Sequence, residues 1–255
     1  MKKLNFVFDS TKKSQGLRKL ILKGNKNISA KKSDVIVVAG GDGFMLKTMK
    51  KYYKLNKPFY GINCGSIGFL MNKYKPNKII QRINKSKAIS ISPLQVKTNN
   101  TKGRKNSFFA INELSILRQS KQTAFLNIKT NKKLLVKKLI GDGVLISTPA
   151  GSTAYNLSIN GPILSLNSKK LAITPISPFR PRRWKGKIVV DTARILIRNI
   201  DPKKRPVAAV ADNNEIRNIS GVSIMSNKKI KFRLLFNSGE SLFKKIKLEQ
   251  LKKIN

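Results

Sequence analysis

The sequence contains no histidine and a single cysteine, Cys64, among its 255 residues. One cysteine cannot form a disulfide within the chain, and it cannot build a cluster of thiolate metal ligands. The lack of histidine excludes the common zinc sites and every mechanism in which an imidazole activates a serine. No feature of the neighbouring sequence favours a thiolate at Cys64, so we expect this thiol to be inert.

Acidic residues are scarce. The chain has 11 Asp and Glu against 54 Lys and Arg, which gives a formal net charge of +43. Such a charge suggests a nucleic-acid partner. However, the lysines are spread along the whole chain, often in pairs such as Lys132-Lys133, and no aromatic-rich basic strand typical of RNA-recognition sheets accompanies them. We interpret most of them as exposed lysines from a compositional bias, and we expect non-specific attraction to polyanions rather than a specific nucleic-acid partner.

Long apolar runs are also missing. No segment approaches the roughly 20 apolar residues of a membrane-spanning helix, and the first residues lack the apolar stretch of a signal peptide. Hydrophobic residues make up 40% of the chain, an ordinary share for a globular protein. We therefore expect a cytoplasmic protein without a membrane partner, folded as one large domain or two modest ones.

The first 90 residues alternate strand and helix patterns. This alternation predicts an α/β domain over residues 1–92, with a parallel sheet and helices on both of its faces. Ligands of such sheets bind at the carboxyl ends of the strands. The strands are expected at Leu4–Phe8, Val35–Ala39 and Pro58–Ile62, and the helices at Thr11–Leu22, Phe44–Tyr53 and Pro76–Ile83.

From about Ser92 the pattern changes to short β-type runs separated by turns rich in Asn, Lys and Gly. Such runs predict an all-β, sandwich-like domain over residues 93–237, with one helical interruption at Ser152–Ser158. The tail shows helical spacing over Ser241–Asn255. The expected strands are Leu94–Thr98, Ser107–Ile111, Leu114–Leu117, Ala124–Lys129, Leu134–Leu139, Val144–Ser147, Leu171–Thr174, Lys187–Val190, Arg194–Ile197, Val207–Val210, Val222–Met225 and Lys231–Phe236.

Two glycine-rich motifs each carry a carboxylate. GGDG at residues 40–43 follows a buried-strand pattern, and GDG at residues 141–143 precedes another. Glycine allows a sharp turn and the close approach of a ligand to the backbone. In the first motif, we expect the N–H groups of Gly40, Gly41 and Gly43, with the N-terminus of the following helix, to face a phosphate group.

The second motif runs into a segment dense in hydroxyl groups. We interpret this segment as a polar recognition surface, because so many hydroxyls on a tight backbone are hard to explain as core. Its hydroxyl residues are Ser147, Thr148, Ser152, Thr153, Tyr155 and Ser158. Two of the 11 acids, Asp42 and Asp142, are the carboxylates of the two glycine-rich motifs.

Together the motifs resemble those of the NAD kinase family. The GGDG loop is shared with diacylglycerol-type lipid kinases and phosphofructokinases, whereas the STPAGSTAY run at residues 147–155 is very specific. The resemblance covers about residues 35–214. Its segments are Gly40–Gly43, Asn63-Cys64-Gly65-Ser66-Ile67-Gly68-Phe69-Leu70, Asn112-Glu113, Gly141–Gly161 and Ile176-Ser177-Pro178-Phe179-Arg180-Pro181.

The resemblance implies an ATP-dependent NAD kinase that phosphorylates the adenosine 2′-hydroxyl of NAD to give NADP. A divalent ion, Mg²⁺, would enter with ATP rather than in a protein cage, so no metal ligands are named. The resemblance also implies a dimeric or tetrameric homo-oligomer, and a tail at residues 238–255 that returns to complete the first domain.

Residue roles follow from the same resemblance. Asp42 is expected to contact the acceptor hydroxyl and act as the catalytic base, because positioning and proton removal are what phosphoryl transfer requires of a protein. Asp142 is expected at the nicotinamide end of NAD, and Tyr155 at the nucleoside. The residues expected to bind NAD are Asp42, Gly43, Asn63, Phe69, Asn112, Glu113, Asp142, Ala150, Thr153, Ala154, Tyr155, Ser158 and Asn214.

The sequence departs from the family pattern twice. Many members carry a histidine near Ile176–Arg180, and this chain has none. Asp212-Asn213-Asn214 lacks the glycine of the family's turn, which weakens the assignment of Asn214. Phe69 fits a core position as well as a ligand contact. The basic run Arg180–Trp184 fits a surface loop, an anion contact or a subunit contact.

Two alternative functions remain. A lipid kinase of the diacylglycerol type would share the GGDG loop and a β-rich second domain. A nucleic-acid-binding protein would explain the charge, and it would bind with a steep salt dependence and without turnover. Neither alternative accounts for both glycine motifs.

Overall fold

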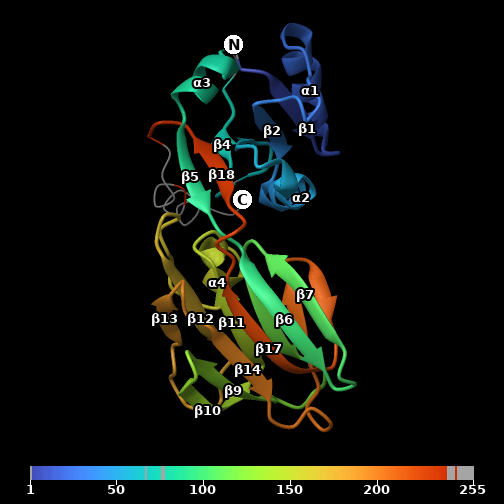
Figure 1. Ribbon diagram of the computed structural model, residues 1–255. Coiled ribbons are helices and arrows are strands. Elements are labelled where there is room, and N and C mark those ends of the chain that lie inside the picture. The colour runs from blue at the N-terminus through green and yellow to red at the C-terminus, as the bar shows by residue number, and fades with distance from the viewer. Residues whose placement is uncertain (1, 67, 76–77, 240–244, 246–255) are drawn as a thin grey trace. The chain divides into compact units, whose positions relative to one another are not determined.

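The computed structural model describes residues 2–66, 68–75 and 78–239, and Lys245. The chain forms two compact units (Figure 1). The first consists of Met1–Ile91 and Ile230–Asn255, and the second of Ser92–Lys229. The sequence patterns placed the second boundary a few residues later, after residue 237.

The first unit contains a mostly parallel sheet. Strands β1 (Leu4–Phe8), β2 (Val35–Gly40) and β3 (Phe59–Asn63) pair in parallel, as the sequence predicts. Strand β18 (Phe232–Phe236) pairs in parallel with β3 and antiparallel with the edge strand β5 (Lys87–Ile91), and the short β4 (Asn72–Lys73) pairs with the other part of β3. The strand order is β1-β2-β3-β18-β5.

Strand β18 lies in the first unit, although its sequence pattern grouped it with the strands of the second domain. Its ring of Phe232 packs at 57° against that of Phe59, with 6.3 Å between the centroids. The apolar pattern of β18 would suit either domain, and only these long-range contacts decide between them. Strand β5 was not predicted. Only Ile91 of its five residues is buried, so its sequence KAISI lacks the apolar run of a buried strand.

Helices cover both faces of this sheet, as expected. Helix α1 (Lys12–Gly24) buries Leu17 and Ile21 against Val35, Val37 and Ala39 of β2. On the opposite face, helix α2 (Asp42–Tyr52) buries Met45 and Met49. Alternate strand residues point to opposite faces, and a Cβ atom at Gly61 of β3 would lie 2.7 Å from Met45 Cε. A side chain at this position would therefore displace the end of the Met45 side chain.

Two further helical elements complete the first unit. The 3-10 helix η1 (Tyr53–Leu55) follows α2, and helix α3 (Ile79–Lys85) buries Ile83 in the same core as α1. Helix α2 begins two residues earlier than predicted, so Asp42 and Gly43 belong to its first turn. The predicted helix over 241–255 and the expected return of the tail lie outside the described residues, except for Lys245.

The second unit is built from two six-stranded antiparallel sheets, whose orders are β10-β9-β14-β17-β6-β7 and β13-β12-β11-β8-β15-β16. The strands of the first are β6 (Leu94–Asn100), β7 (Lys105–Ala110), β9 (Ala124–Thr130), β10 (Lys133–Gly141), β14 (Ile195–Asn199) and β17 (Ile219–Ser226). Those of the second are β8 (Glu113–Arg118), β11 (Gly143–Ser147), β12 (Lys170–Ile176), β13 (Lys187–Val190), β15 (Val207–Ala211) and β16 (Asn214–Ile216).

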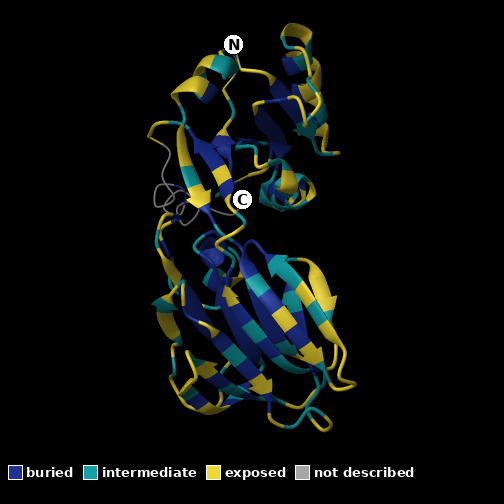
Figure 2. Ribbon diagram, in the orientation of Figure 1, coloured by how far each residue is buried: buried dark blue, intermediate teal, exposed yellow. Residues whose placement is uncertain are grey.

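A single apolar core joins the inward faces of these two sheets (Figure 2). Leu126, Ile128 and Ile197 come from one sheet, and Ile116 and Ile146 come from the other. Burial of such side chains supplies about 25 cal/mol for each Å² of apolar surface removed from water. The predicted sandwich-like domain is therefore confirmed.

The helical interruption consists of the 3-10 helix η2 (Gly151–Thr153) and the one-turn helix α4 (Tyr155–Ser158), which follow β11. None of the helices in the described part of the chain has the length and apolar character needed to cross a membrane.

Candidate functional site

Asp42 stands at the start of α2, directly after the carboxyl end of β2. Both of its carboxylate oxygens accept hydrogen bonds from one backbone segment. Phe69 N–H donates to Oδ2 at 2.8 Å, and Leu70 N–H donates to Oδ1 at 3.0 Å. Bonds from two successive amides fix the orientation of the carboxylate, so Asp42 is held in place before any ligand binds.

Burial raises the pKa of the Asp42 carboxyl above its usual range. The hydrogen bonds from Phe69 and Leu70 and the charge of Lys245 act in the opposite direction, but they do not cancel the effect of burial. A carboxylate with a raised pKa is a stronger base than an ordinary aspartate. Its proton affinity lies closer to what general-base chemistry near neutral pH requires.

The three glycines of GGDG have different surroundings. Gly40 ends β2, and a Cβ atom there would lie 2.8 Å from both Asp9 Oδ2 and Phe44 Cδ1. Gly40 is thus needed for packing. A Cβ atom at Gly41 or Gly43 would meet no protein atom within 4 Å. These two glycines serve no packing need inside the protein, so the space beside them is open to a ligand.

The loop after β3 places Asn63 beside GGDG. Gly40 pairs with Asn63 across the sheet, and Cys64 N–H donates to Gly40 O at 2.9 Å. The Oδ1 atom of Asn63 accepts from Gly65 N–H at 3.0 Å, which shapes the loop.

Burial raises the pKa of the Cys64 thiol, in keeping with an unreactive cysteine. Phe69 is partly buried, and its backbone rather than its ring contacts Asp42.

In the second unit, Asp212 organises the Asn112-Glu113 turn. Its carboxylate accepts from Ile111 N–H at 2.9 Å and from Asn112 N–H at 2.8 Å, and its own N–H donates to Glu113 O. Asn112 is 9% exposed, and its Oδ1 atom has no hydrogen-bond partner among the described residues. A buried amide oxygen without a partner is costly unless a ligand supplies one.

Thr148 joins this turn to the STPAGSTAY segment. Its hydroxyl donates to Ile111 O at 2.7 Å and accepts from Gly151 N–H, while its own N–H donates to Asn112 O. Gly151 lies so close to the turn that a Cβ atom there would be 2.2 Å from Asn112 O. The two motifs therefore form one packed backbone unit.

The interpretation of the whole hydroxyl-rich segment as a recognition surface is wrong for three of its residues. Ser147, Thr148 and Ser152 are at most 1% exposed. Their hydroxyls bond to backbone groups, as Ser152 Oγ does with Pro149 O and Leu164 N–H. These hydroxyls hold the loop together, because a tight buried backbone leaves polar groups that need partners.

The residues after Gly151 are displayed on η2 and α4. Tyr155 is 37% exposed and Ser158 is exposed, whereas Ala150 and Thr153 are buried and Ala154 is intermediate. Asn156, which the sequence analysis did not single out, is fully buried and donates to Ser152 O and Pro162 O. It also accepts from Thr174 Oγ1 at 2.7 Å. This amide anchors α4 to β12 and thereby sets the direction of Tyr155.

Asp142 lies between β10 and β11 in an ion pair with Arg118, whose Nε is 2.6 Å from Asp142 Oδ1. The side chains are 36% and 37% exposed, so solvent reaches both. Asn214 begins the edge strand β16 and is exposed, and Asp212 before it has a φ of 49° without a glycine. Asn112, Asp142 and Asn214 are thus carried by the same sheet, through β8, β11 and β16.

Comparison with known proteins decides the family. Models described as the ATP-NAD kinase N-terminal and C-terminal domains match residues 4–88 and 111–228. The NAD kinase of Zymomonas mobilis is 41% identical over 252 residues, which is 98% of this chain and 98% of that protein. The NAD kinase of Caulobacter vibrioides is 40% identical over 97% of this chain and 95% of that protein.

The chain belongs to the NAD kinase family. Two solved structures share the fold, each with a TM-score of 0.74. Yeast NADH kinase, complexed with NADH, is 21% identical over 88% of this chain and 68% of that chain. An NAD kinase from Archaeoglobus fulgidus, in complex with ATP, is 20% identical over 96% of this chain and 98% of that chain.

Within this NAD kinase family member, the motif residues fall into two groups. Asp42, Gly43, Asn63 and Phe69 lie in the first unit. Those in the second unit are Asn112, Glu113, Asp142, Ala150, Thr153, Ala154, Tyr155, Ser158 and Asn214. Neither the lipid-kinase alternative nor the nucleic-acid-binding alternative finds support in the relatives.

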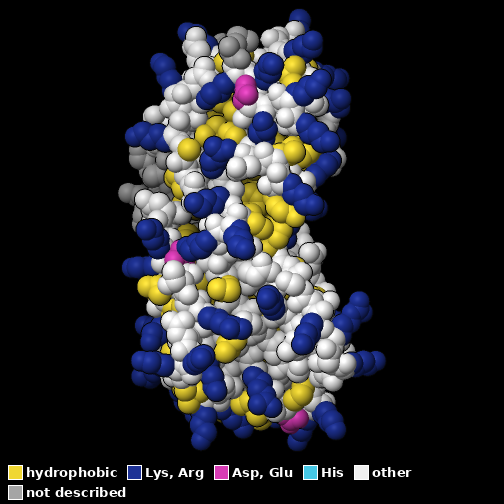
Figure 3. Space-filling view, viewed as in Figure 1, with side chains coloured by type: hydrophobic (Ala, Val, Ile, Leu, Met, Phe, Trp, Pro, Cys, Tyr) yellow, Lys and Arg dark blue, Asp and Glu magenta, His cyan; other side chains and the backbone are white. Residues whose placement is uncertain are grey.

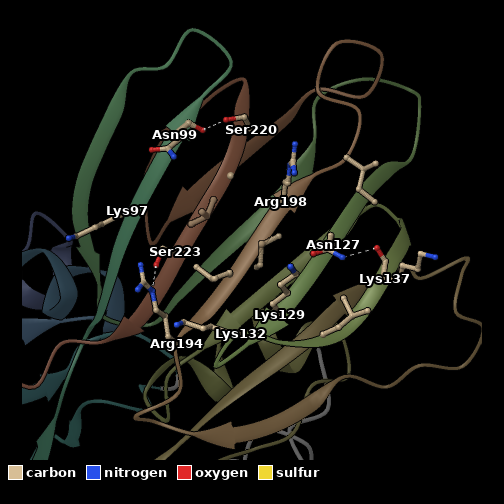
Figure 4. Close-up of a pocket in the computed structure, with 16 residues that line it drawn as sticks. Lys97, Asn99, Asn127, Lys129, Lys132, Lys137, Arg194, Arg198, Ser220 and Ser223 are labelled. Carbon is tan, nitrogen blue, oxygen red and sulfur yellow. Dashed lines mark hydrogen bonds between the residues drawn. The ribbon is translucent and has the colours of Figure 1, made fainter.

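A basic groove lies on the outer face of the β10-β9-β14-β17-β6 part of the first sheet (Figure 4). Its volume is about 1140 Å³, and none of the motif residues or acids lines it. Its cations are Lys97, Lys129, Lys132, Lys137, Arg194 and Arg198. Figure 3 likewise shows Lys and Arg scattered over each unit of this family member, with few Asp and Glu. The groove is part of this general basic surface.

Proposed function

We propose that this chain is an ATP-dependent NAD kinase, which moves the γ-phosphoryl group of ATP to the adenosine 2′-hydroxyl of NAD. Membership of the family over 98% of the chain supports this activity. The structural observation that carries it is Asp42, a fixed, partly buried carboxylate at a helix N-terminus whose neighbours Gly41 and Gly43 leave open space.

In the proposed reaction, Asp42 accepts the proton of the 2′-hydroxyl. The hydroxyl oxygen forms a bond to the γ-phosphorus, the bond between that phosphorus and the bridging oxygen of ADP breaks, and NADP and ADP leave. The first-turn N–H groups of α2 and its dipole favour the anionic phosphates. Catalysis of this kind depends mainly on positioning, which the two amide bonds to Asp42 provide.

Mg²⁺ is proposed to enter with ATP and to neutralise charge on the phosphates. No group of three or more Cys, Asp or Glu side chains that could hold a metal ion occurs in the described part of the chain. The ligands would then be nucleotide phosphates and water. Asp42 keeps the role of orienting the hydroxyl and holding its proton.

The second unit is proposed to bind NAD. Asn112 Oδ1 is a buried acceptor that an adenine amino group or a ribose hydroxyl would satisfy. The exposed ring of Tyr155 offers an apolar face for a nucleoside, and Asp142 offers a carboxylate at the nicotinamide end. Accordingly, we propose the second unit, Ser92–Lys229, as the NAD-binding domain and the first unit as the domain that carries GGDG.

Asp142→Ala and Tyr155→Ala are expected to raise KM for NAD by about tenfold each, or ~1.4 kcal/mol of binding free energy, with little change in kcat. Neither residue touches the transferred group, and lost uniform binding changes KM alone. Steady-state kinetics with varied NAD measure this effect.

Arg118→Ala is the matched control, since it removes the same ion pair but keeps the Asp142 carboxylate. Its KM for NAD should stay near the wild-type value. A fall in kcat with unchanged NAD affinity in Asp142→Ala or Tyr155→Ala would remove these residues from the binding role.

Gly43→Ala is expected to leave the fold intact and to weaken nucleotide binding. The methyl group meets no protein atom, and alanine stabilises a helix relative to glycine by about 0.5–1 kcal/mol. An unwanted methyl against a bound phosphate would cost about 1–3 kcal/mol, or roughly 5- to 150-fold in KM.

The matched control for this experiment is Gly16→Ala in α1, where a Cβ atom also meets no atom within 4 Å. Both variants should gain similar thermal stability, and only Gly43→Ala should bind substrates poorly. Equal KM values in the two variants would show that no ligand approaches Gly43.

One assay tests the activity itself. Purified protein is incubated with ATP and either NAD or diacylglycerol, and NADP and phosphatidate are measured. Formation of NADP is expected, and phosphorylation of the lipid alone would support the lipid-kinase alternative. Further arms with NADH and with inorganic polyphosphate define the acceptor and the donor. We also propose a cytoplasmic location, which cell fractionation tests, and a homo-oligomeric state, which light scattering of the purified protein tests.

A further inference from the structure

Lys245 is a buried cation that the activity described above does not use. The residue is 9% exposed. Its Nζ atom donates to Phe69 O at 3.3 Å and to Met71 O, and it lies 5.2 Å from the centroid of the Phe236 ring. A lysine is seldom buried so deeply without a structural or functional reason.

The contacts of Lys245 and those of Asp42 meet on the same three residues. The segment Phe69–Met71 donates two successive N–H groups to the Asp42 carboxylate. The carbonyl groups of Phe69 and Met71 accept from the Lys245 ammonium. The segment is thus held between an anion on its amide side and a cation on its carbonyl side.

We propose that Lys245 is a positioning residue for Asp42: its ammonium fixes the Phe69–Met71 segment so that the amides of Phe69 and Leu70 orient the carboxylate. This inference rests on the proposed role of Asp42 as base. It assigns a catalytic contribution to the C-terminal part of the chain, through a residue that need not touch either substrate.

The charge of Lys245 acts on Asp42 as well. Burial disfavours the ionised carboxylate, and the positive charge of Lys245 opposes this effect and lowers the pKa of Asp42. Other titratable groups near the start of α2 are the Asp9 carboxylate beside Gly40 and the Cys64 thiol, whose pKa burial raises. The lysines of α2 itself are Lys47, Lys50 and Lys51.

Removal of this cation should therefore change the pH dependence of the reaction in a known direction. Asp42 must be ionised to accept a proton, so activity is lost as the pH falls through its pKa. Without Lys245 that pKa rises. The acidic limb of the kcat/KM profile should then move to higher pH in Lys245→Met, and the activity just above the wild-type limb should fall most.

The experiment compares three variants of the full chain. Lys245→Met removes the charge and the donor, Lys245→Arg keeps both, and Lys19→Met removes an exposed lysine of α1. The expected result is a shifted acidic limb in Lys245→Met, and profiles close to wild type in the other two. A Lys245→Met enzyme with an unmoved limb would overturn the inference, and so would the same shift in Lys19→Met.

A second measurement does not depend on catalysis. Hydrogen–deuterium exchange of peptides that contain Phe69–Met71 should accelerate in Lys245→Met and remain slow in Lys245→Arg. Unchanged exchange in Lys245→Met would show that Lys245 does not fix the Phe69–Met71 segment, even if activity fell. If Lys245→Met does not fold, Lys245→Arg still tests the inference. Fast exchange of this segment in a folded Lys245→Arg would refute the proposed role of Lys245, because arginine keeps the charge and the donor.

The two hypotheses can fail separately. If Asp42→Asn keeps full activity, Asp42 is not the base, yet the exchange measurement still tests whether Lys245 fixes the Phe69–Met71 segment. If Asp42 is the base and the exchange of Phe69–Met71 is unaffected in Lys245→Met, only the positioning role of Lys245 fails.

Discussion

Asp42→Asn is expected to lower kcat for NADP formation by about 10²–10⁴-fold, the usual contribution of a general base. The amide cannot accept the proton of the 2′-hydroxyl, although its size and its place in the first turn of α2 are unchanged. NAD should still bind, because the other proposed contacts remain. Single-turnover kinetics and a direct NAD titration separate these two effects.

The fold should survive this substitution. Burial raises the pKa of Asp42, so ionisation opposes folding as the pH rises from the usual range of a carboxyl through this raised value. Asparagine removes that opposing charge, while one of the amides of Phe69 and Leu70 loses its acceptor. These effects offset each other, and thermal unfolding near neutral pH should stay close to that of wild type.

The pH profile gives a further check on Asp42. The acidic limb of kcat/KM for the wild type should lie above the pKa range of an ordinary aspartate, and the residual activity of Asp42→Asn should lack this limb. Asp34→Asn, which changes an exposed carboxylate in the same unit, is the control with full activity. Turnover by Asp42→Asn near the wild-type rate would exclude Asp42 as the base.

Local patterns were sufficient for most of the fold. The alternation of apolar strands and amphipathic helices predicted the parallel order of β1, β2 and β3, because buried parallel strands are continuous apolar runs. The same reasoning could not place β18, because its short apolar sequence FRLLF fits a buried strand in either unit. Its partners, β3 and β5, lie far away in the sequence.

The site shows the same limit. The motif spacing singled out Asp42, Asn112 and Asp212, but it did not show which groups hold Asp42 and Asn112 in place. Asp212 accepts from residues about 100 positions earlier, and Lys245 reaches residues more than 170 positions earlier. The density of hydroxyl groups in STPAGSTAY likewise predicted an exposed recognition surface, although three of these hydroxyl residues are buried and bond to backbone groups. Only the packed structure shows which of these side chains bond to the backbone of the loop itself.

Gly151→Ala is expected to destabilise the second unit and to impair NAD binding together. A Cβ atom there would lie 2.2 Å from Asn112 O, 2.4 Å from Asn112 C and 2.7 Å from Asn112 Cα. All three are backbone atoms, so no side-chain rotation can relieve the clash. Overpacking costs typically about 1–3 kcal/mol and occasionally more, and each kcal/mol lowers Tm by roughly 2–4 °C for a protein of this size.

The clash falls on the turn that presents Asn112. To accommodate the methyl group, the STPAGSTAY loop and the turn must separate, which strains the bonds of Thr148 to Ile111 O and Asn112 O. The orientation of the buried Asn112 Oδ1 would then change, and KM for NAD should rise by at least about tenfold, or ~1.4 kcal/mol. Calorimetry and steady-state kinetics measure the two effects on one preparation.

Gly221→Ala separates this steric effect from the general cost of replacing a glycine. Gly221 lies in β17 of the same unit, and a Cβ atom there would be 3.6 Å from Ile197 O, an ordinary contact distance. This control should match the wild type in Tm and in KM for NAD. If Gly151→Ala matched it in both, the close approach of the two motifs would not be what shapes the NAD site. If Gly151→Ala lost stability but kept the wild-type KM for NAD, the turn at Asn112 would not contribute to NAD binding.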